Sequence, residues 1–420
     1  MSPARNNVRV EPGDDHRAAI ERNLRLIPVH IALSRSLVWI SVMVLFTRAR
    51  FDLDGALQLS SIYYLSVVAL EVPSGWMSDR LGRVTTVRVA AASWIVSHSL
   101  FLIGDDIFWV IATAQFFLAA GFASLSGTDV TLHYDTLESL GIEDEFTRRE
   151  PRVSSLAYVA TAVSALAGGA LGLVDLRLAF AASLVLACAQ LAVALRLHQP
   201  PGEHHADPFG RQLALCARYL RQRFIGWIFF YGILLVTLEH VAFSLMQPWL
   251  TEVLGRSPDD VGSTPLFAGA VFAATAIVGS FAARFSAPLA DRFGIVATLI
   301  GLGAVSAAIV TGMWWTTSAV MLLIVVFRSV QGAAAPVLIS AAVAPRTLRQ
   351  HRATLLSLNS LAGRLGWGGI LLVVSTDAGD DVTATLGTFA WLSWAMIAVL
   401  IATSWIAMTG RAASTPVSAP

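Results

Sequence analysis

The sequence has few charged residues and no lysine. Charged side chains make up 14% of its 420 residues and hydrophobic ones 55%, whereas soluble proteins have about 25% charged residues. A soluble protein with so little charge would expose large apolar patches. The composition therefore excludes an ordinary soluble enzyme.

Motifs that carry enzyme chemistry are also missing. The sequence contains no G-x-x-x-x-G-K-[ST] phosphate loop, no H-E-x-x-H metal motif and no G-x-S-x-G nucleophile turn. Its two cysteines, Cys188 and Cys216, have no spacing typical of a disulfide framework or metal cluster. The net charge of +1 gives no basic surface for nucleic acid. We therefore expect no cofactor, no metal site and no nucleic-acid partner.

Long apolar runs are what the sequence has instead. A transmembrane helix needs about 20 mostly apolar residues, and twelve runs approach that length. They predict an all-α protein of the lipid bilayer. The expected spans are 26–47, 57–77, 85–103, 107–131, 153–174, 177–196, 224–250, 264–287, 295–315, 319–343, 353–375 and 385–408.

Arginine predicts the orientation of these spans. With the N-terminus inside, fifteen loop arginines fall on the inner side and four on the outer side, and cytoplasmic loops are enriched in basic residues. We expect both termini in the cytoplasm and no cleavable signal peptide. The expected segments are a cytoplasmic arm (1–25), a six-helix bundle (26–197), a linker that can include an amphipathic helix (198–223), a second six-helix bundle (224–410) and a disordered tail (411–420).

Two loops on the arginine-rich side resemble each other. Residues 75–83 read GWMSDRLGR and residues 287–294 read APLADRFG. Their aspartates, Asp79 and Asp291, lie 212 positions apart, about half the chain length. A repeat of this period indicates two similar halves.

At these residues the sequence resembles the major facilitator superfamily of secondary transporters, whose best-known motif is G-x-x-x-D-R-x-G-R. The first loop matches every fixed position and the second keeps three of them. Residues 71–75 and 127–141 resemble bacterial drug-exporter-like members. The resemblance implies two pseudo-symmetric six-helix bundles. The matching residues are Gly75, Asp79, Arg80, Gly82 and Arg83, then Asp291, Arg292 and Gly294.

We expect the first loop to act as a cytoplasmic gate. Asp79 can lie near the N-terminus of a helix in the other half, where the helix dipole favours a carboxylate. Arg83 can pair with Asp129 near the inner end of the fourth span. Rocking of the halves would break and remake this contact. The alternative is a static loop staple.

Ionisable residues at membrane depth are costly and are therefore functional candidates. Glu239 lies fifteen residues into the seventh span, or about 22 Å along a helix that rises 1.5 Å per residue. Burial favours the neutral form of Glu239, and a nearby arginine favours its charged form. A change in which residue lies beside it can therefore make Glu239 bind or release a proton. Arg328 and Arg364 are the expected partners. The alternatives are a structural ion pair and a substrate contact.

Glu71 and Arg35 are further candidates in the first half. Glu71 precedes Pro73 just before the first motif, and structural and coupling roles both remain open for it. Arg35 can neutralise Glu71 or bind an anionic substrate. Aromatic side chains can line the cavity or face lipid and the membrane interface. The cavity candidates are Tyr64, Phe117, Phe230, Tyr231 and Phe243.

The resulting hypothesis is a monomeric secondary transporter of a bacterial cytoplasmic membrane. We expect alternating access and export of a small amphiphilic compound, such as an antibiotic, a drug or a secondary metabolite, in exchange for protons. One alternative is an importer of a nutrient or siderophore-like solute. A more remote alternative is a membrane-embedded enzyme or receptor on the same scaffold.

Overall fold

In the computed structural model the described parts of the chain are residues 14–201, 217–347, 349–376 and 379–412. These parts are helical and contain no strand. Twelve of their helical segments are long and apolar enough to cross a membrane. In the bilayer core a helix satisfies all of its own backbone hydrogen bonds, which explains why apolar runs of this length fold as helices.

The first half contains six crossings, two of which are interrupted. The first crossing comprises α1 and the short helices that follow it, and α5 and α6 together form the fourth. The elements are α1 (Asp14–Ser34), η1 (Val38–Ser41), α2 (Met43–Arg48), α3 (Leu53–Leu81), α4 (Arg83–Ile103), α5 (Phe108–Leu125), α6 (Thr128–Ser139), η2 (Glu143–Glu145), α7 (Phe146–Gly172) and α8 (Leu176–Arg196).

The second half repeats this plan with the other six crossings. Its fourth crossing is also interrupted, by the short helix η3. The elements are α10 (Arg223–Val253), α11 (Thr264–Phe293), α12 (Ile295–Trp315), α13 (Val320–Val325), η3 (Val326–Arg328), α14 (Ser329–Val343), η4 (Ala344–Arg346), α15 (Arg349–Val374) and α16 (Val382–Ala412). The structure is thus the expected pair of six-helix bundles.

The segments expected outside the bundles are only partly described. Residues 14–25 of the expected N-terminal arm form the beginning of α1, while 1–13 lie outside the described residues. Residues 202–216, which include most of the expected linker helix, and residues 413–420 of the tail also lie outside the described residues.

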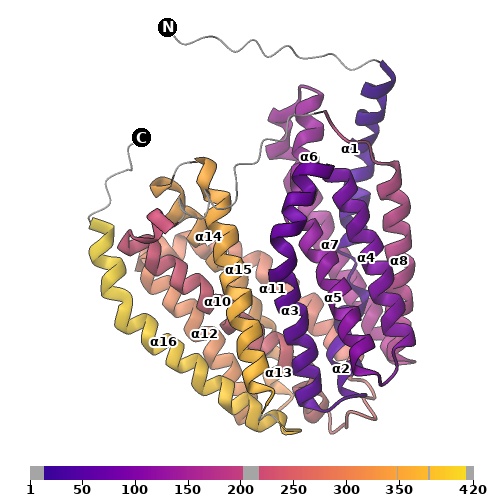
Figure 1. Ribbon diagram of the computed structural model, residues 1–420. Coiled ribbons are helices and arrows are strands. Elements are labelled where there is room, and N and C mark those ends of the chain that lie inside the picture. The colour runs from indigo at the N-terminus through magenta and orange to yellow at the C-terminus, as the bar shows by residue number, and fades with distance from the viewer. Residues whose placement is uncertain (1–13, 202–216, 348, 377–378, 413–420) are drawn as a thin grey trace.

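The two halves meet at one end of the molecule (Figure 1). We call the end where α1 begins and α16 ends the terminal side, and the other end the opposite side. Helix α7 packs on α11, and α3 packs on α15. A methyl group on Gly169 would lie 2.6 Å from the Pro265 carbonyl oxygen, and one on Gly269 would lie 2.5 Å from that of Ala165. Glycine at both positions lets the helix backbones touch.

Three buried apolar clusters hold the halves and join them. One lies within the first half and one within the second. The remaining cluster contains Leu53, Leu57 and Tyr64 of the first half together with many residues of the second. This shared cluster reinforces the helix contacts on the opposite side. The cavity described next lies between these contacts and the terminal side.

Candidate functional site

A cavity of about 520 Å³ lies between the two halves. The first crossing, α3, α5 and the start of α6 form one wall, and α10 and α15 form the other. Its lining is mostly aromatic and aliphatic, with two arginines, one aspartate, one histidine, two glutamines, three serines and one glycine. The apolar and aromatic lining residues are Leu37, Trp39, Ile40, Met43, Val44, Tyr63, Tyr64, Val67, Leu118, Phe122, Leu125, Val130 and Phe243.

Two interrupted crossings expose polar groups to this cavity. The first crossing is not helical at Arg35–Leu37, and the fourth is not helical at Ser126 and Gly127, where φ is +73° at the glycine. Arg35, Leu37, Ser126 and Gly127 all line the cavity. Irregular backbone at membrane depth is tolerated where it lines a cavity or is buried in protein. These breaks therefore belong to the candidate site.

Gln247 of α10 satisfies backbone groups of the interrupted first crossing. Its Oε1 accepts hydrogen bonds from the N–H groups of Val44 (3.0 Å) and Leu45 (3.1 Å). Its Nε2 donates to the Ile40 carbonyl at 2.7 Å. The side chain is 1% exposed, so these bonds are shielded from water. A residue of the second half thus supplies partners that a continuous helix would supply for itself.

Arg35 pairs with Asp129 across the terminal end of the cavity. Arg35 Nη2 lies 3.1 Å from Asp129 Oδ2. Asp129 is 4% exposed and lies in the first turn of α6, where the helix dipole favours a carboxylate. The expected pairing of Asp129 with Arg83 is therefore wrong in this structure. The break after Ser34 places the Arg35 guanidinium beside α6.

Glu71 and Arg364 form an ion pair between the halves. Arg364 Nη1 on α15 donates to Glu71 Oε2 on α3 at 2.8 Å. The other oxygen of Glu71 accepts a hydrogen bond from the Ser126 hydroxyl at 3.1 Å. Arg364 was an expected partner of Glu239, and that pairing does not occur here. The contact of α3 with α15 places Glu71 nearer to Arg364.

Glu239 packs inside the second half. A methyl group on Gly332 of α14 would lie 2.1 Å from Glu239 Oε1, and Glu239 is not among the cavity-lining residues. It interacts electrostatically with buried Arg328, but the residues that the structure describes include no ion-pair partner for it. The Arg328 guanidinium carbon lies 5.4 Å from the centre of the Phe243 ring and 5.0 Å from that of Phe272.

Two of the five expected cavity aromatics, Tyr64 and Phe243, line the cavity. Phe117, Phe230 and Tyr231 do not. The Tyr231 side chain is fully buried in the second half, and its hydroxyl donates to the Leu299 carbonyl at 2.9 Å. Trp39, Phe122 and Gln247 are among the lining residues that the sequence did not indicate.

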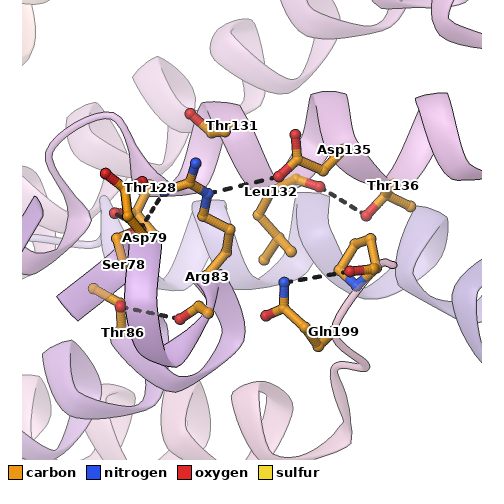
Figure 2. A network of polar contacts seen from close by, with 12 residues as sticks. Ser78, Asp79, Arg83, Thr86, Thr128, Thr131, Leu132, Asp135, Thr136 and Gln199 are labelled. Atoms are coloured by element: carbon orange, nitrogen blue, oxygen red, sulfur yellow. Dashed lines mark hydrogen bonds and ion pairs between the residues drawn. The ribbon is translucent and has the colours of Figure 1, made fainter. Parts of the chain in front are cut away.

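The first motif forms an ionic cluster within its own half (Figure 2). Arg83 Nη1 donates to Asp79 Oδ1 at 2.6 Å and to the Ser78 hydroxyl at 2.8 Å. Arg83 Nε lies 3.6 Å from Asp135 Oδ2 on α6. The partner on α6 is therefore Asp135 rather than Asp129. Asp79 was expected near a helix N-terminus of the other half, and here it contacts Arg83 instead.

The remaining motif positions are exposed or serve the turn. Gly75 and Arg80 are exposed, while Gly82 has φ +93° between α3 and α4. In the second motif Asp291 and Arg292 are exposed, and Gly294 has φ +82°. Within the described ranges, neither motif makes an ion pair with the other half.

The opposite side carries its own polar contacts between the halves. Buried Arg48 forms an ion pair with Asp380, whose Oδ1 also accepts the Leu53 N–H at 3.1 Å. The Arg48 hydrogen bond is the main reason why the pKa of Asp380 is lowered from its ordinary value. The Ser61 hydroxyl donates to the Gly368 carbonyl at 2.7 Å. These contacts keep that side closed in this structure.

No metal site is evident in the parts of the chain that the structure covers. They contain no group of three or more His, Cys, Asp or Glu side chains placed to hold a metal ion.

The fold is similar to that of several solved membrane transporters. A mutant form of the nucleoside transporter NupG is 13% identical, with a TM-score of 0.75 over 91% of this chain and 100% of that one. The POT family transporter PepTSo is 12% identical, with a TM-score of 0.68 over 93% and 98%. A bacterial homologue of the human lysosomal transporter Spinster, inward-facing and unoccupied, is 14% identical, with a TM-score of 0.63 over 95% and 98%.

The twelve candidate membrane helices and the family match given next identify a multi-pass membrane transporter rather than an enzyme. The family comparison matches residues 31–371 to the Major Facilitator Superfamily, and the chain belongs to that family. Curated protein sequences give no significant match.

Proposed function

We propose that the chain is a secondary active transporter that works by alternating access and exports a small amphiphilic compound in exchange for protons. An antibiotic, a drug or a secondary metabolite would fit this description. The observation that carries the proposal is the cavity of about 520 Å³ to which both halves contribute. Its aromatic and aliphatic walls, with polar side chains among them, suit amphiphilic molecules. We propose that the chain belongs to a drug-exporter-like branch of the family.

We further propose a monomer in the cytoplasmic membrane of a bacterium, with the terminal side in the cytoplasm. The arginine-rich turns on that side support this orientation. The bundles 26–197 and 224–410 would rock about the cavity, joined by the linker 198–223. In this orientation the closed contacts of Arg48 and Ser61 face outward, and the cavity lies toward the cytoplasm, where an exporter takes up its cargo.

The ion pair of Glu71 with Arg364 is the proposed coupling element. It joins the two halves, so their movement must stretch or break it. A proton that neutralises Glu71 removes the attraction for Arg364 and loosens this connection. Protonation and rocking would then depend on each other, as proton coupling requires. This assignment puts Glu71 ahead of Glu239 in the proposed mechanism.

Glu239 and Arg328 form the second proposed coupling element. Both lie inside the second half, away from the cavity lining, which also suits a structural role in packing α10 against α14. Replacement of Glu239 by glutamine distinguishes these roles. A coupling residue would alter the pH dependence of transport, whereas a structural residue would alter stability alone.

The first motif is the proposed gate of the terminal side. When the opposite side opens, the terminal ends of the halves must approach each other. The Arg83 cluster and the exposed Asp291 and Arg292 would then come within reach of the other half. Exchange of partners between the two states would make the gate bistable.

Uptake of a solute together with protons is the second candidate function. The specific observation in its favour is again the ion pair of Glu71 and Arg364. A proton on Glu71 would free the Arg364 guanidinium for an acidic solute. Proton and solute would then bind together and cross in the same direction.

Transport by purified protein in liposomes tests both candidates. A panel of fluorescent amphiphilic compounds is offered to vesicles with an acidic interior or an acidic exterior. Accumulation driven by the acidic interior supports exchange, whereas accumulation driven by the acidic exterior supports uptake. If neither gradient moves any compound, proton coupling is wrong.

Two variants sharpen this test. Glu71→Gln should abolish the response to the gradient while leaving exchange of compound for compound. The matched control, Glu138→Gln, removes an exposed carboxylate on α6 and should respond like the unmodified protein. An unchanged gradient response in Glu71→Gln would refute the coupling role of this residue.

A further inference from the structure

The cavity exposes its two arginines more than the carboxylates that pair with them. The Arg35 side chain is 42% exposed and that of Asp129 is 4% exposed. For Arg364 and Glu71 the values are 33% and 14%. Both arginines line the cavity, whereas Glu71 does not. The basic member of each pair is therefore the one more exposed to a bound molecule.

Each guanidinium keeps donors for a further partner. A guanidinium has five N–H donors. Within the described part of the chain, Arg35 makes one hydrogen bond to Asp129 and Arg364 makes one to Glu71. The planar fork of an arginine matches the geometry of a carboxylate or phosphate group. The remaining donors can thus bind an acidic group in the cavity.

The aromatic residues of the cavity wall suit an apolar part of a bound molecule. Trp39, Tyr63, Phe122 and Phe243 provide aromatic surface, and Tyr63 contacts Phe122 edge-on with ring centres 6.2 Å apart. Such surfaces bind flat or branched apolar bodies by burial and by edge or face contacts. Asp129 is the only carboxylate among the lining residues that the structure describes, and it already faces Arg35.

We infer that the substrate is an organic anion: an aromatic or branched apolar body with one acidic group, which Arg364 and Arg35 bind. One arginine comes from each half, so the bound anion contacts both bundles. This inference rests on the proposed function only in taking the cavity as the transport site. It does not depend on the direction of transport.

Binding to the full-length protein in nanodiscs tests the inference without transport. Calorimetry compares 1-naphthylacetate, its neutral amide and 1-naphthylmethylamine, which share one ring system. A matched set built on indole provides a second apolar body. We expect each carboxylate to bind about tenfold or more tightly than its amide, because the neutral amide oxygen accepts a weaker hydrogen bond from a guanidinium than a charged carboxylate does.

Variants locate the preference within the cavity. Arg364→Gln should weaken binding of the carboxylate and leave only the preference over the amide that Arg35 supplies. Because this change leaves Glu71 without its cation, the double variant Glu71→Gln with Arg364→Gln provides a check in which both charges are absent. Arg364→Lys should keep part of the preference. The control, Arg284→Gln, removes an exposed arginine of α11 and should change nothing.

The outcomes separate this inference from the proposed function. Tighter binding of the amines or amides in both sets, or binding of no compound, overturns the inference. A carboxylate preference that is undiminished in the double variant overturns the assignment to Arg364. If the carboxylates bind as expected but no proton gradient moves them, the inference stands and the proposed proton coupling fails.

Discussion

The turn between α3 and α4 and the turn between α11 and α12 occupy equivalent places in the two halves. In both, a glycine with positive φ separates two helices, with φ +93° at Gly82 and +82° at Gly294. In both, a threonine four residues later donates its hydroxyl to the glycine carbonyl, at 3.1 Å from Thr86 and 2.9 Å from Thr298. The backbone turn is therefore common to the two halves.

The ionic cluster is specific to the first turn. Where the first turn has Arg83 between two aspartates, the second has Ile295, and its Asp291 is exposed. The first turn also receives Gln199, whose Oε1 accepts the Val84 N–H at 3.0 Å. The comparison shows that the reversal of the chain needs only the glycine and the threonine. The added charges are available for another role, which supports their proposed use as a gate.

The largest difference between the turns should follow from replacing their glycines. Gly82→Ala should lower the free energy of unfolding by about 3 kcal/mol, because a positive φ is unfavourable and the Gln199 hydrogen bond is lost. The new methyl group would lie 2.7 Å from Gln199 Oε1. Gly294→Ala meets open space and should cost about 1.5 kcal/mol. Denaturant unfolding followed by circular dichroism measures both, and equal losses would contradict the comparison.

Replacing an arginine in each turn should give the next largest difference. Arg83→Gln leaves Asp79 and Asp135 without their shared cation, so we expect a loss of about 2 kcal/mol, less than for a fully buried ion pair. Arg292→Gln changes an exposed side chain beside the Phe293 ring and should stay within about 0.5 kcal/mol. The same unfolding measurement applies. A loss in Arg292→Gln as large as in Arg83→Gln would show that the cluster adds no stability.

Removal of the Gln199 side chain should have a smaller effect that is confined to the first turn. Gln199→Ala leaves the Val84 N–H at the start of α4 without its acceptor, for an expected loss of about 1 kcal/mol. Hydrogen exchange followed by mass spectrometry should show faster exchange at the start of α4 and unchanged exchange at the start of α12. Faster exchange in both turns would mean that the effect is not local.

The smallest effect is expected from making the second turn more like the first. In Ile295→Arg the new guanidinium lies four residues after Asp291, as Arg83 does after Asp79, and such a pair contributes about 0.3–0.5 kcal/mol. A carboxylate equivalent to Asp135 would still be needed to rebuild the rest of the cluster. A thermal unfolding midpoint raised by several degrees would show that charge alone distinguishes the two turns.

The fold was predictable because the membrane leaves few choices. Apolar runs long enough to span a bilayer must be helical, and the repeated motif showed that the halves are alike. The interruptions at Arg35 and Gly127 could not be predicted, since small and polar residues also occur within continuous membrane helices. The bounds of α6 then decided whether Asp129 or Asp135 would meet Arg83.

The site was predicted less completely. A search for ionisable residues found Glu71, Arg35 and Arg364, but it could not pair them, because pairing depends on which helices of the two halves touch. Polar and apolar residues are interspersed along α3 and α15, so periodicity does not distinguish a cavity-lining face from one buried in a bundle. Phe117 and Phe230 lie in spans that border the cavity, but their position in a span does not show which way their rings face. Gln247 was overlooked because it carries no charge.

The Gln247 contacts have a consequence for how this part of the sequence can change over time. All three of its partners are backbone atoms at positions 40, 44 and 45, and every amino acid except proline supplies the same atoms. Substitutions at these positions can accumulate without loss of the connection. The connection itself is therefore sensitive to replacement of a single glutamine, while the cavity-lining side chains at positions 40 and 44 can change and reshape the adjoining wall without breaking it.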